Sequence, residues 1–251
     1  MALSNIIGIG LVGLGLALLF FFALPGRQRE ARVWRPIPAI RRLRRAIGLA
    51  VEDGKRLHIS LGKANLLTPD NGSALSGLST LERIARMSVV SDRPPVVTSG
   101  DGALAVLSQD TLLAAYRTSH ALDQYDPDRG RLSGPTALSY VAGSLPVIRD
   151  EQVSTNILIG NFGPEVALMT EASEKARAFT LAASDSLAAQ AVLYAAAEET
   201  LIGEELFAAP AYLQAGAAHQ ASLRVQDVLR WVLVALLILG ALLKMAGVDL
   251  L

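Results

Sequence analysis

The stretch Pro95-Val-Val-Thr-Ser-Gly-Asp-Gly102 begins as a short apolar run and ends in a glycine turn, and residues 103–116 continue with helical spacing. A short strand, a tight turn and a helix make one βα unit. Three other segments follow the same order: an apolar run, then small or polar residues, then a helical pattern. Their apolar runs lie at residues 56–61, 156–159 and 178–182.

Short strands that alternate with longer helical segments imply parallel pairing through right-handed crossovers. The expected fold class is therefore α/β, with a Rossmann-like, open and mostly parallel sheet flanked by helices. Further strands are expected within residues 136–150 or 188–207, where Val192-Leu-Tyr194 fits either a strand or a helix. Residues 123–135 are dense in turn formers and predict an exposed loop.

Both ends of the chain carry long apolar segments. No charged side chain occurs from Met1 to Gly26, and about 20 apolar residues cross a hydrocarbon core of about 30 Å. A cleaved signal peptide is the alternative, but the uncharged start and the lack of a small-residue cleavage site favour an uncleaved anchor. Residues 231–243 are also uncharged, and this run reaches Val248 if Lys244 extends to the far interface. We expect two transmembrane helices; a buried core helix is the alternative for the second.

Arginine is concentrated after the first apolar segment. Between Arg27 and Arg45 there are eight arginines and one acid, Glu30. Such an excess beside a membrane helix stays in the cytoplasm. The expected protein is a two-pass inner-membrane protein with both termini outside. The expected parts are a transmembrane helix at 1–26, a basic juxtamembrane segment at 27–54, a cytoplasmic α/β domain at 55–222 and a transmembrane helix at 223–251.

The basic segment has the pattern of an amphipathic helix. Apolar residues from Ile37 to Val51 recur at helical spacing, and four arginines fall largely elsewhere around the helix. A basic amphipathic helix beside a membrane span is typical of contact with anionic lipid headgroups. The alternatives are arginines that only fix topology, ion pairs within the protein, and nucleic-acid binding, which we disfavour. The predicted lipid-contacting residues are Arg41, Arg42, Arg44 and Arg45.

A small-ligand site is expected outside the carboxyl ends of the strands, where parallel α/β sheets bind ligands. Helix N-termini at this edge present unpaired N–H groups that favour anions. The alternative is that tight βα turns use glycine whether or not a ligand binds, and the glycines lack the full dinucleotide-binding spacing. The candidate residues are Gly62, Thr98, Ser99, Gly100, Gly102, Gly160, Gly163 and Asp185.

Catalytic and metal-binding patterns are weak. The chain has no cysteine, which excludes disulfides, thiolate metal sites and a cysteine nucleophile. Its three histidines are far apart, and His58 is expected to be a satisfied core or surface residue. Ser60-Leu-Gly-Lys63 matches a short serine-acylase pattern without its companion motifs. The paired acids at 198–199 and 204–205 are interpreted as a solvated face or ion pairs. We expect no enzyme activity, no cofactor and no metal.

Several segments resemble an uncharacterised bacterial membrane-protein family, known as a domain of unknown function. They are Lys55-Arg-Leu-His-Ile-Ser-Leu-Gly62, Ser91-Asp-Arg-Pro-Pro-Val-Val-Thr-Ser-Gly-Asp-Gly102, Asp150-Glu-Gln-Val-Ser-Thr-Asn156 and Leu201-Ile-Gly-Glu-Glu-Leu206. The resemblance covers most of residues 26–248. It implies the same architecture and carries no catalytic residues.

The leading functional hypothesis is a structural or assembly protein, whose cytoplasmic domain mediates homo-oligomerisation or docking in a larger membrane complex. Small residues seven positions apart let membrane helices approach closely. The alternative is a membrane-tethered sensor of a nucleotide or anion, and an enzyme acting on lipid headgroups or nucleotides ranks third. The expected partners are membrane lipid and further protein subunits, without nucleic acid. The small-residue pairs are Gly8 with Gly15, Gly10 with Ala17, and Gly240 with Gly247.

Overall fold

The computed structural model describes residues 3–24, 35–66, 71–214 and 216–245. Internal contacts divide the chain into two compact units, which are described separately. The first, called the α/β unit here, is Arg35–Ala215, and the second, the apolar unit, combines Met1–Trp34 with Gly216–Leu251. Residues 27–34 of the expected basic segment and Gly247 of the small-residue pairs lie outside the described residues.

The α/β unit has six strands, with helices between them. The strands are β1 (Arg56–Gly62), β2 (Val96–Ser99), β3 (Gly130–Leu132), β4 (Val153–Asn161), β5 (Phe179–Ser184) and β6 (Glu199–Leu201). The helices are α2 (Pro38–Glu52), α3 (Gly72–Ser88), α4 (Gly102–Thr118), α5 (Ala137–Asp150), α6 (Ala167–Lys175), α7 (Leu187–Ala196) and α8 (Glu205–Tyr212). Short 3-10 turns cover Leu122–Gln124, Pro127–Arg129 and Pro164–Val166.

All six strands form one parallel sheet in the order β3-β2-β1-β4-β5-β6. The centre of the sheet is set by β1, where Ile59 lies opposite Val97 of β2 and Ile157 of β4. Strands buried on both faces are rich in apolar residues, which is why β2, β4 and β5 are recognisable in the sequence; in β1, apolar Leu57, Ile59 and Leu61 alternate with polar residues. The expected α/β class and the Rossmann-like parallel sheet are confirmed.

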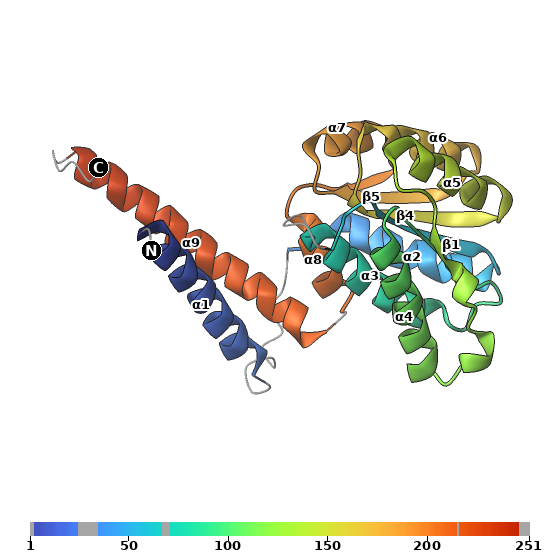
Figure 1. Ribbon diagram of the computed structural model, residues 1–251, viewed down its shortest axis with the longest axis horizontal. Helices are drawn as coiled ribbons and strands as arrows, with labels where there is room; N and C mark the ends of the chain where they lie inside the picture. The colour runs from blue at the N-terminus through green and yellow to red at the C-terminus, as the bar shows by residue number, and fades with distance from the viewer. Residues whose placement is uncertain (1–2, 25–34, 67–70, 215, 246–251) are drawn as a thin grey trace. The chain divides into compact units, whose positions relative to one another are not determined.

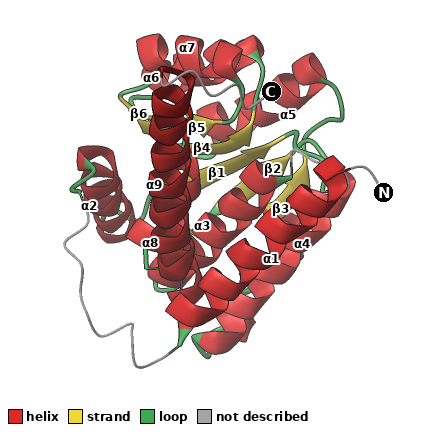
Figure 2. Cartoon of the chain, turned by 90° about the vertical axis from the view of Figure 1, so that its left-hand side faces the viewer, coloured by secondary structure: helices red, strands yellow, loops and turns green. Residues whose placement is uncertain are grey.

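Helices cover both faces of the sheet, as Figure 1 shows, and Figure 2 shows the strands in order between them. On one face, α5, α6 and α7 enclose a core that includes Tyr140, Leu158 and Met169. On the other, α2, α3 and α8 pack around a larger core that includes Leu43, Ile59 and Leu81. The sheet is therefore the middle of three layers.

The two edge strands compare differently with the sequence expectations: β3 was not expected, whereas β6 lies in a segment where a further strand was expected. The segment 123–135 was expected to be a loop, but it contains β3, which pairs with β2 at the sheet edge. Residues 136–150 were considered for a strand and form α5 instead, with a capping box at Thr136. Residues 188–207 do contain an extra strand, β6, whereas Val192 and Tyr194 belong to α7. Three-residue edge strands with polar residues carry almost no periodic signal.

The amphipathic helix predicted in the basic segment is confirmed as α2. Its apolar stripe, including Ile40, Leu43 and Ile47, is buried in the core. Proline in the first turn fits, because an N–H group there has no helical partner. From Arg35 onward, the basic segment is thus packed into the α/β unit.

The apolar unit contains α1 (Leu3–Ala23) and α9 (Ala217–Met245), which contact each other. By length and composition, one helix among the described side chains is able to cross a membrane, Ala218–Met245. The apolar part of α1 whose side chains are described, Gly8–Ala23, is shorter than that. The structure thus provides one candidate span at the C-terminal end, where two terminal spans were expected.

Candidate functional site

The carboxyl edge of the sheet gathers the predicted ligand-binding residues. β1 lies between β2 and β4, so the chain winds in one direction from β1 to β3 and in the other from β4 to β6. Open α/β sheets bind ligands where the strand order reverses in this way. The ends of β1 and β4, near Gly62 and Asn161, mark that point.

Two of the predicted glycines serve strand packing. Gly62 has a positive φ of 72°, and a Cβ atom there would lie 2.2 Å from the Asn161 carbonyl oxygen. At Gly160, a Cβ atom would lie 2.0 Å from the Leu61 carbonyl oxygen. The pairing of β1 with β4 is irregular between Ser60 and Gly62. Both glycines are therefore required by the close approach of two backbones, with or without a ligand.

An ion pair joins the turns that follow β1 and β4. Lys63 Nζ donates to Glu165 Oε1 at 2.8 Å, and both side chains are largely buried. Burial alone would raise the pKa of Glu165, but the hydrogen bond and charge of Lys63 hold the pKa below its usual value. The neighbouring glycines adjoin this pair, because a Cβ at Gly100 would meet Lys63 and a Cβ at Gly163 would meet Glu165. The only lysine in these turns is thus already neutralised.

Carboxylates and a hydroxyl occupy the remaining turns. Asp101 Oδ1 accepts a 3.0 Å hydrogen bond from Leu104 N and caps α4, and Ser186 caps α7. Asp185 accepts a 2.8 Å hydrogen bond from Asn161 Nδ2. Ser99 Oγ contacts only backbone carbonyls, at 3.4 Å. These side chains thus already have partners in the backbone or in Asn161, and the acids disfavour an anion. Within the described part of the chain, a Cβ atom at Gly102 would meet nothing within 4 Å.

Thr98 belongs to a buried polar network that the sequence did not reveal. His58 Nε2 lies 2.9 Å from Thr98 Oγ1, and His58 Nδ1 lies 2.7 Å from Asn156 Oδ1. On the other side, Tyr140 Oη lies 3.4 Å from Thr98 Oγ1, contacts Ser60 Oγ and accepts a hydrogen bond from the backbone N–H of Gly62 at 3.2 Å. All of these side chains are buried. The network connects β2, β1, β4 and α5 beneath the carboxyl edge.

The ends of the network determine the protonation of His58. Asn156 Nδ2 donates to Ser173 Oγ at 2.5 Å, and Ser173 Oγ donates to the Met169 carbonyl at 3.0 Å. Asn156 Oδ1 must therefore accept from His58 Nδ1–H, which leaves Nε2 to accept from the Thr98 hydroxyl. Burial lowers the pKa of His58 to about 4. His58 is therefore a neutral, hydrogen-bonded core residue, which is one of the two interpretations that the sequence favoured.

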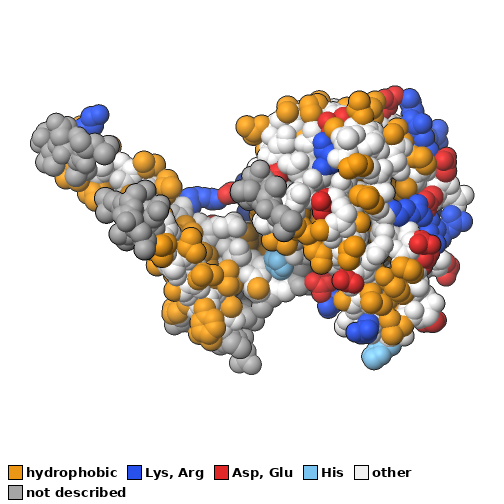
Figure 3. Space-filling model, in the orientation of Figure 1, with side chains coloured by type: hydrophobic (Ala, Val, Ile, Leu, Met, Phe, Trp, Pro, Cys, Tyr) orange, Lys and Arg blue, Asp and Glu red, His pale blue; other side chains and the backbone are white. Residues whose placement is uncertain are grey.

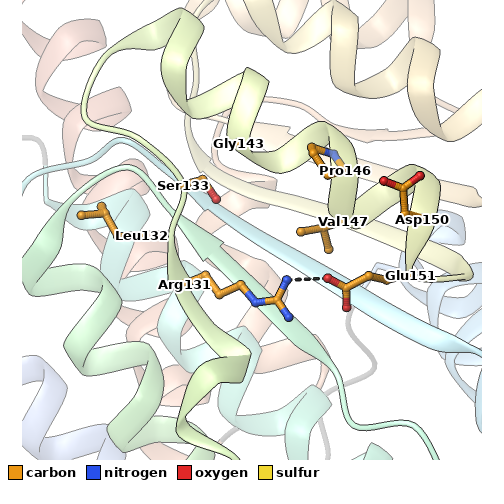
Figure 4. A pocket seen from close by; sticks show the side chains of 8 residues that line it. All are labelled: Arg131, Leu132, Ser133, Gly143, Pro146, Val147, Asp150 and Glu151. Atoms are coloured by element: carbon orange, nitrogen blue, oxygen red, sulfur yellow. Dashed lines mark hydrogen bonds and ion pairs between the residues drawn. The ribbon is translucent and has the colours of Figure 1, made fainter.

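A second polar cluster lies at the opposite edge, where the strands begin. Glu151 forms ion pairs with Arg56 and Arg131 and lies 4.0 Å from Arg129 Nη1. Burial alone would raise the pKa of Glu151, but Arg131 and Arg56 hold the pKa below its usual value. Figure 4 shows Arg131 and Glu151 directed toward each other beside a cavity of about 360 Å³. This ion-pair cluster fastens β1 and β3 to the end of α5.

The four arginines predicted to contact lipid have different surroundings. Arg42 forms an ion pair with Glu199, and Arg44 donates to the carbonyl oxygen of Tyr212. Arg41 and Arg45 are exposed and make no ion pair or hydrogen bond within the described residues. Two of the four arginines thus stabilise the α/β unit itself, as the ion-pair alternative anticipated.

Together, the strand order and the closed, self-paired carboxyl edge define a doubly wound α/β protein with apolar helices at its ends. No cluster of three or more potential metal ligands occurs among the described residues. The chain belongs to the DUF6754 family, a domain of unknown function whose model matches residues 4–251. The resemblance to an uncharacterised family is thereby confirmed. No curated protein and no solved structure matches the chain.

Proposed function

We propose that this chain is a membrane-anchored assembly protein, whose α/β unit docks onto copies of itself or onto other subunits of a membrane complex. The observation that carries the proposal is the outer surface of α7. Its sequence, Leu-Ala-Ala-Gln-Ala-Val-Leu-Tyr-Ala-Ala, contains no charged residue. One side of the helix is buried through Ala189 and Leu193.

The opposite side of α7 is open to solvent. Leu187 is 82% exposed and Tyr194 is 72% exposed, and the residues between them on this side are alanines. Figure 3 shows apolar side chains along the edge where Figure 1 places α7. A helix that covers a soluble domain normally has a polar outer face, whereas a helix that is apolar all round is normally buried. Burying one such large side chain contributes about 1.5–3 kcal/mol. A protein surface that covers α7 explains its composition.

The terminal helices support anchoring and assembly. We propose that α1 and α9 both span the inner membrane and that the α/β unit faces the cytoplasm. Among the described residues, a Cβ atom added at Gly8, Gly15 or Gly240 would meet nothing within 4 Å. These small residues are therefore not used in the contact between α1 and α9, and they leave room for another membrane helix. On the α/β unit, Arg41 and Arg45 are proposed to contact anionic lipid headgroups.

Mild-detergent extraction followed by native mass spectrometry tests the assembly proposal. The expected result is an oligomer or a complex with copurifying subunits; monomers alone, with no bound protein, would contradict it. A reporter fused at His120, an exposed position, tests the topology. Reporter activity outside the inner membrane would overturn the cytoplasmic placement.

A nucleotide or anion sensor is the second candidate, because the strand order places a switch point between β1 and β4. A thermal-shift screen with nucleotides and phosphorylated metabolites tests it. Gly102→Val is a suitable variant, since the space around Gly102 accepts a side chain. If a ligand stabilises the wild type and Gly102→Val abolishes this shift while the fold survives, the sensor hypothesis replaces assembly as the leading function.

A further inference from the structure

The exposed face of α7 has two parallel edges of different size. Leu187 and Tyr194 are seven positions apart and form a bulky edge. Ala188 and Ala195, with the same spacing, form a small edge, and Ala191 lies between the two. All five residues are exposed. The face is nearly symmetric about Ala191, because each edge has one member toward either end of the helix.

We propose that α7 pairs antiparallel with α7 of a second copy, around a twofold axis that passes near Ala191. The inference rests on the proposed assembly function and names the partner. In an isologous contact, residue i meets residue j and residue j meets residue i. Here Leu187 lies opposite Tyr194 of the second copy, Ala188 lies opposite Ala195, and Ala191 lies opposite itself.

The sizes of the side chains suit this arrangement. Packed helices lie about 8–10 Å apart depending on the side chains at the contact, and the alanine edge allows an approach at the short end of this range. At that distance, Leu187 of each copy packs against Tyr194 of the other copy along the bulky edge. Each copy buries Leu187 and the ring of Tyr194. Gln190 keeps both of its partners, since it donates to the Ser184 carbonyl and accepts from Gly203 N.

Charge also favours the antiparallel direction. Beside the C-terminal end of α7 lies a cavity of about 510 Å³, whose lining combines alanines with Glu171, Glu174 and Glu198. An antiparallel copy brings the N-terminal end of its own α7 to this place. Glu171 is already paired with Lys175, and Asp185, just before α7, accepts a hydrogen bond from Asn161. Helix N-termini carry partial positive charge, so Glu174 and Glu198 attract the N-terminal end of the partner helix. A parallel pair would place the partner's negative helix end there instead. The face of α7 itself has no charge that would repel an identical face.

The contact is small, which explains why anchoring matters. Five side chains on each copy bury less than the roughly 1,200 Å² of a stable soluble interface. Two copies held in one membrane meet at a raised effective concentration, and a weak contact is then occupied. The pairing is therefore tested in the membrane with the full chain.

Cysteine cross-linking is well suited, because the chain has no cysteine of its own. A disulfide requires Cα atoms about 4.4–6.8 Å apart, so Ala191→Cys is expected to cross-link to itself, with a shift from monomer to dimer on a non-reducing gel. Ala188→Cys and Ala195→Cys, expressed together with distinguishable tags, are expected to form the mixed dimer in preference to either self-dimer. The matched control is Val90→Cys, which is 82% exposed, as Leu187 is, but lies outside α7.

The outcomes separate the pairing from the wider function. Self-cross-linking of Val90→Cys as strong as that of Ala191→Cys would show random collision and overturn the pairing. Introducing Leu187→Glu into the Ala191→Cys chain is expected to abolish the dimer band, whereas Val90→Glu in the same chain leaves it unchanged. If Ala191→Cys fails to cross-link while native mass spectrometry still shows an oligomer, the α7 pairing is wrong and the assembly function stands. If native mass spectrometry shows only monomers without bound protein, both proposals fail.

Discussion

Mild acid is expected to destabilise the α/β unit through His58. This imidazole is fully buried and neutral, and burial lowers its pKa from 6.5 to about 4. In the unfolded chain the same group takes up a proton near pH 6.5, so between these two pKa values the unfolded state binds more protons than the folded state. Stability is therefore complete above pH 6.5 and falls as the pH decreases toward 4. One pKa unit corresponds to about 1.4 kcal/mol, so the total loss is about 3 kcal/mol, of which about 2 kcal/mol appears between pH 7 and 5.

Denaturant unfolding of the full chain in detergent, followed by far-UV circular dichroism at several pH values, measures this loss. His58→Gln serves as the comparison, because glutamine keeps hydrogen-bonding groups but does not titrate. The variant is expected to be less stable at pH 7 and to lack the slope between pH 7 and 5. Carboxylates such as Glu151 and Glu165 titrate in both proteins and cancel in the difference. Equal slopes for wild type and variant would refute the assignment of a neutral buried imidazole.

Three further substitutions test the packing, each by the change in unfolding free energy. Gly62→Ala places a Cβ 2.2 Å from a backbone oxygen at a positive φ and is expected to cost more than about 2 kcal/mol. Gly48→Ala, at a partly exposed helix position with room for a Cβ, is instead expected to stabilise by about 0.5–1 kcal/mol. Similar losses for both would argue against the close approach of β1 and β4. Tyr140→Phe removes the acceptor for a buried backbone N–H and is expected to cost about 1–3 kcal/mol, while Tyr194→Phe, at 72% exposure, changes stability by less than about 0.5 kcal/mol. Glu151→Gln leaves two guanidinium groups without their carboxylate and is expected to cost about 1–3 kcal/mol; a neutral effect would mean that solvent replaces the ion pairs.

The sequence predicted the central strands well because burial on both faces concentrates apolar residues in them, as in Leu57, Ile59 and Leu61 of β1 and in residues 157–159 of β4. The edge strands β3 and β6 were not recognisable, because each has three residues and includes a charged one. For the basic segment, helical spacing predicted α2. Its position against the sheet was not predictable, because it depends on contacts between residues far apart in the chain.

The candidate edge was placed correctly by topology, yet its chemistry was not predictable. Nothing in the sequence indicates that Lys63 pairs with Glu165 or that Asp101 caps its own helix. The network around His58 depends on the register that puts it beside Asn156 and on the position of Tyr140 in α5. Neither register nor helix position leaves a periodic signal in one sequence.

The position of β1 has a consequence for synthesis. This strand is made early, but its partner β4 follows only after five further α-helices and strands, so Ile59 pairs with Ile157 late in synthesis. A nascent chain that ends before Val153 therefore exposes the unpaired edge of β1 that later pairs with β4. Protease digestion of ribosome-arrested chains is expected to cleave near β1 until β4 has emerged; early protection would mean that another segment covers β1 first.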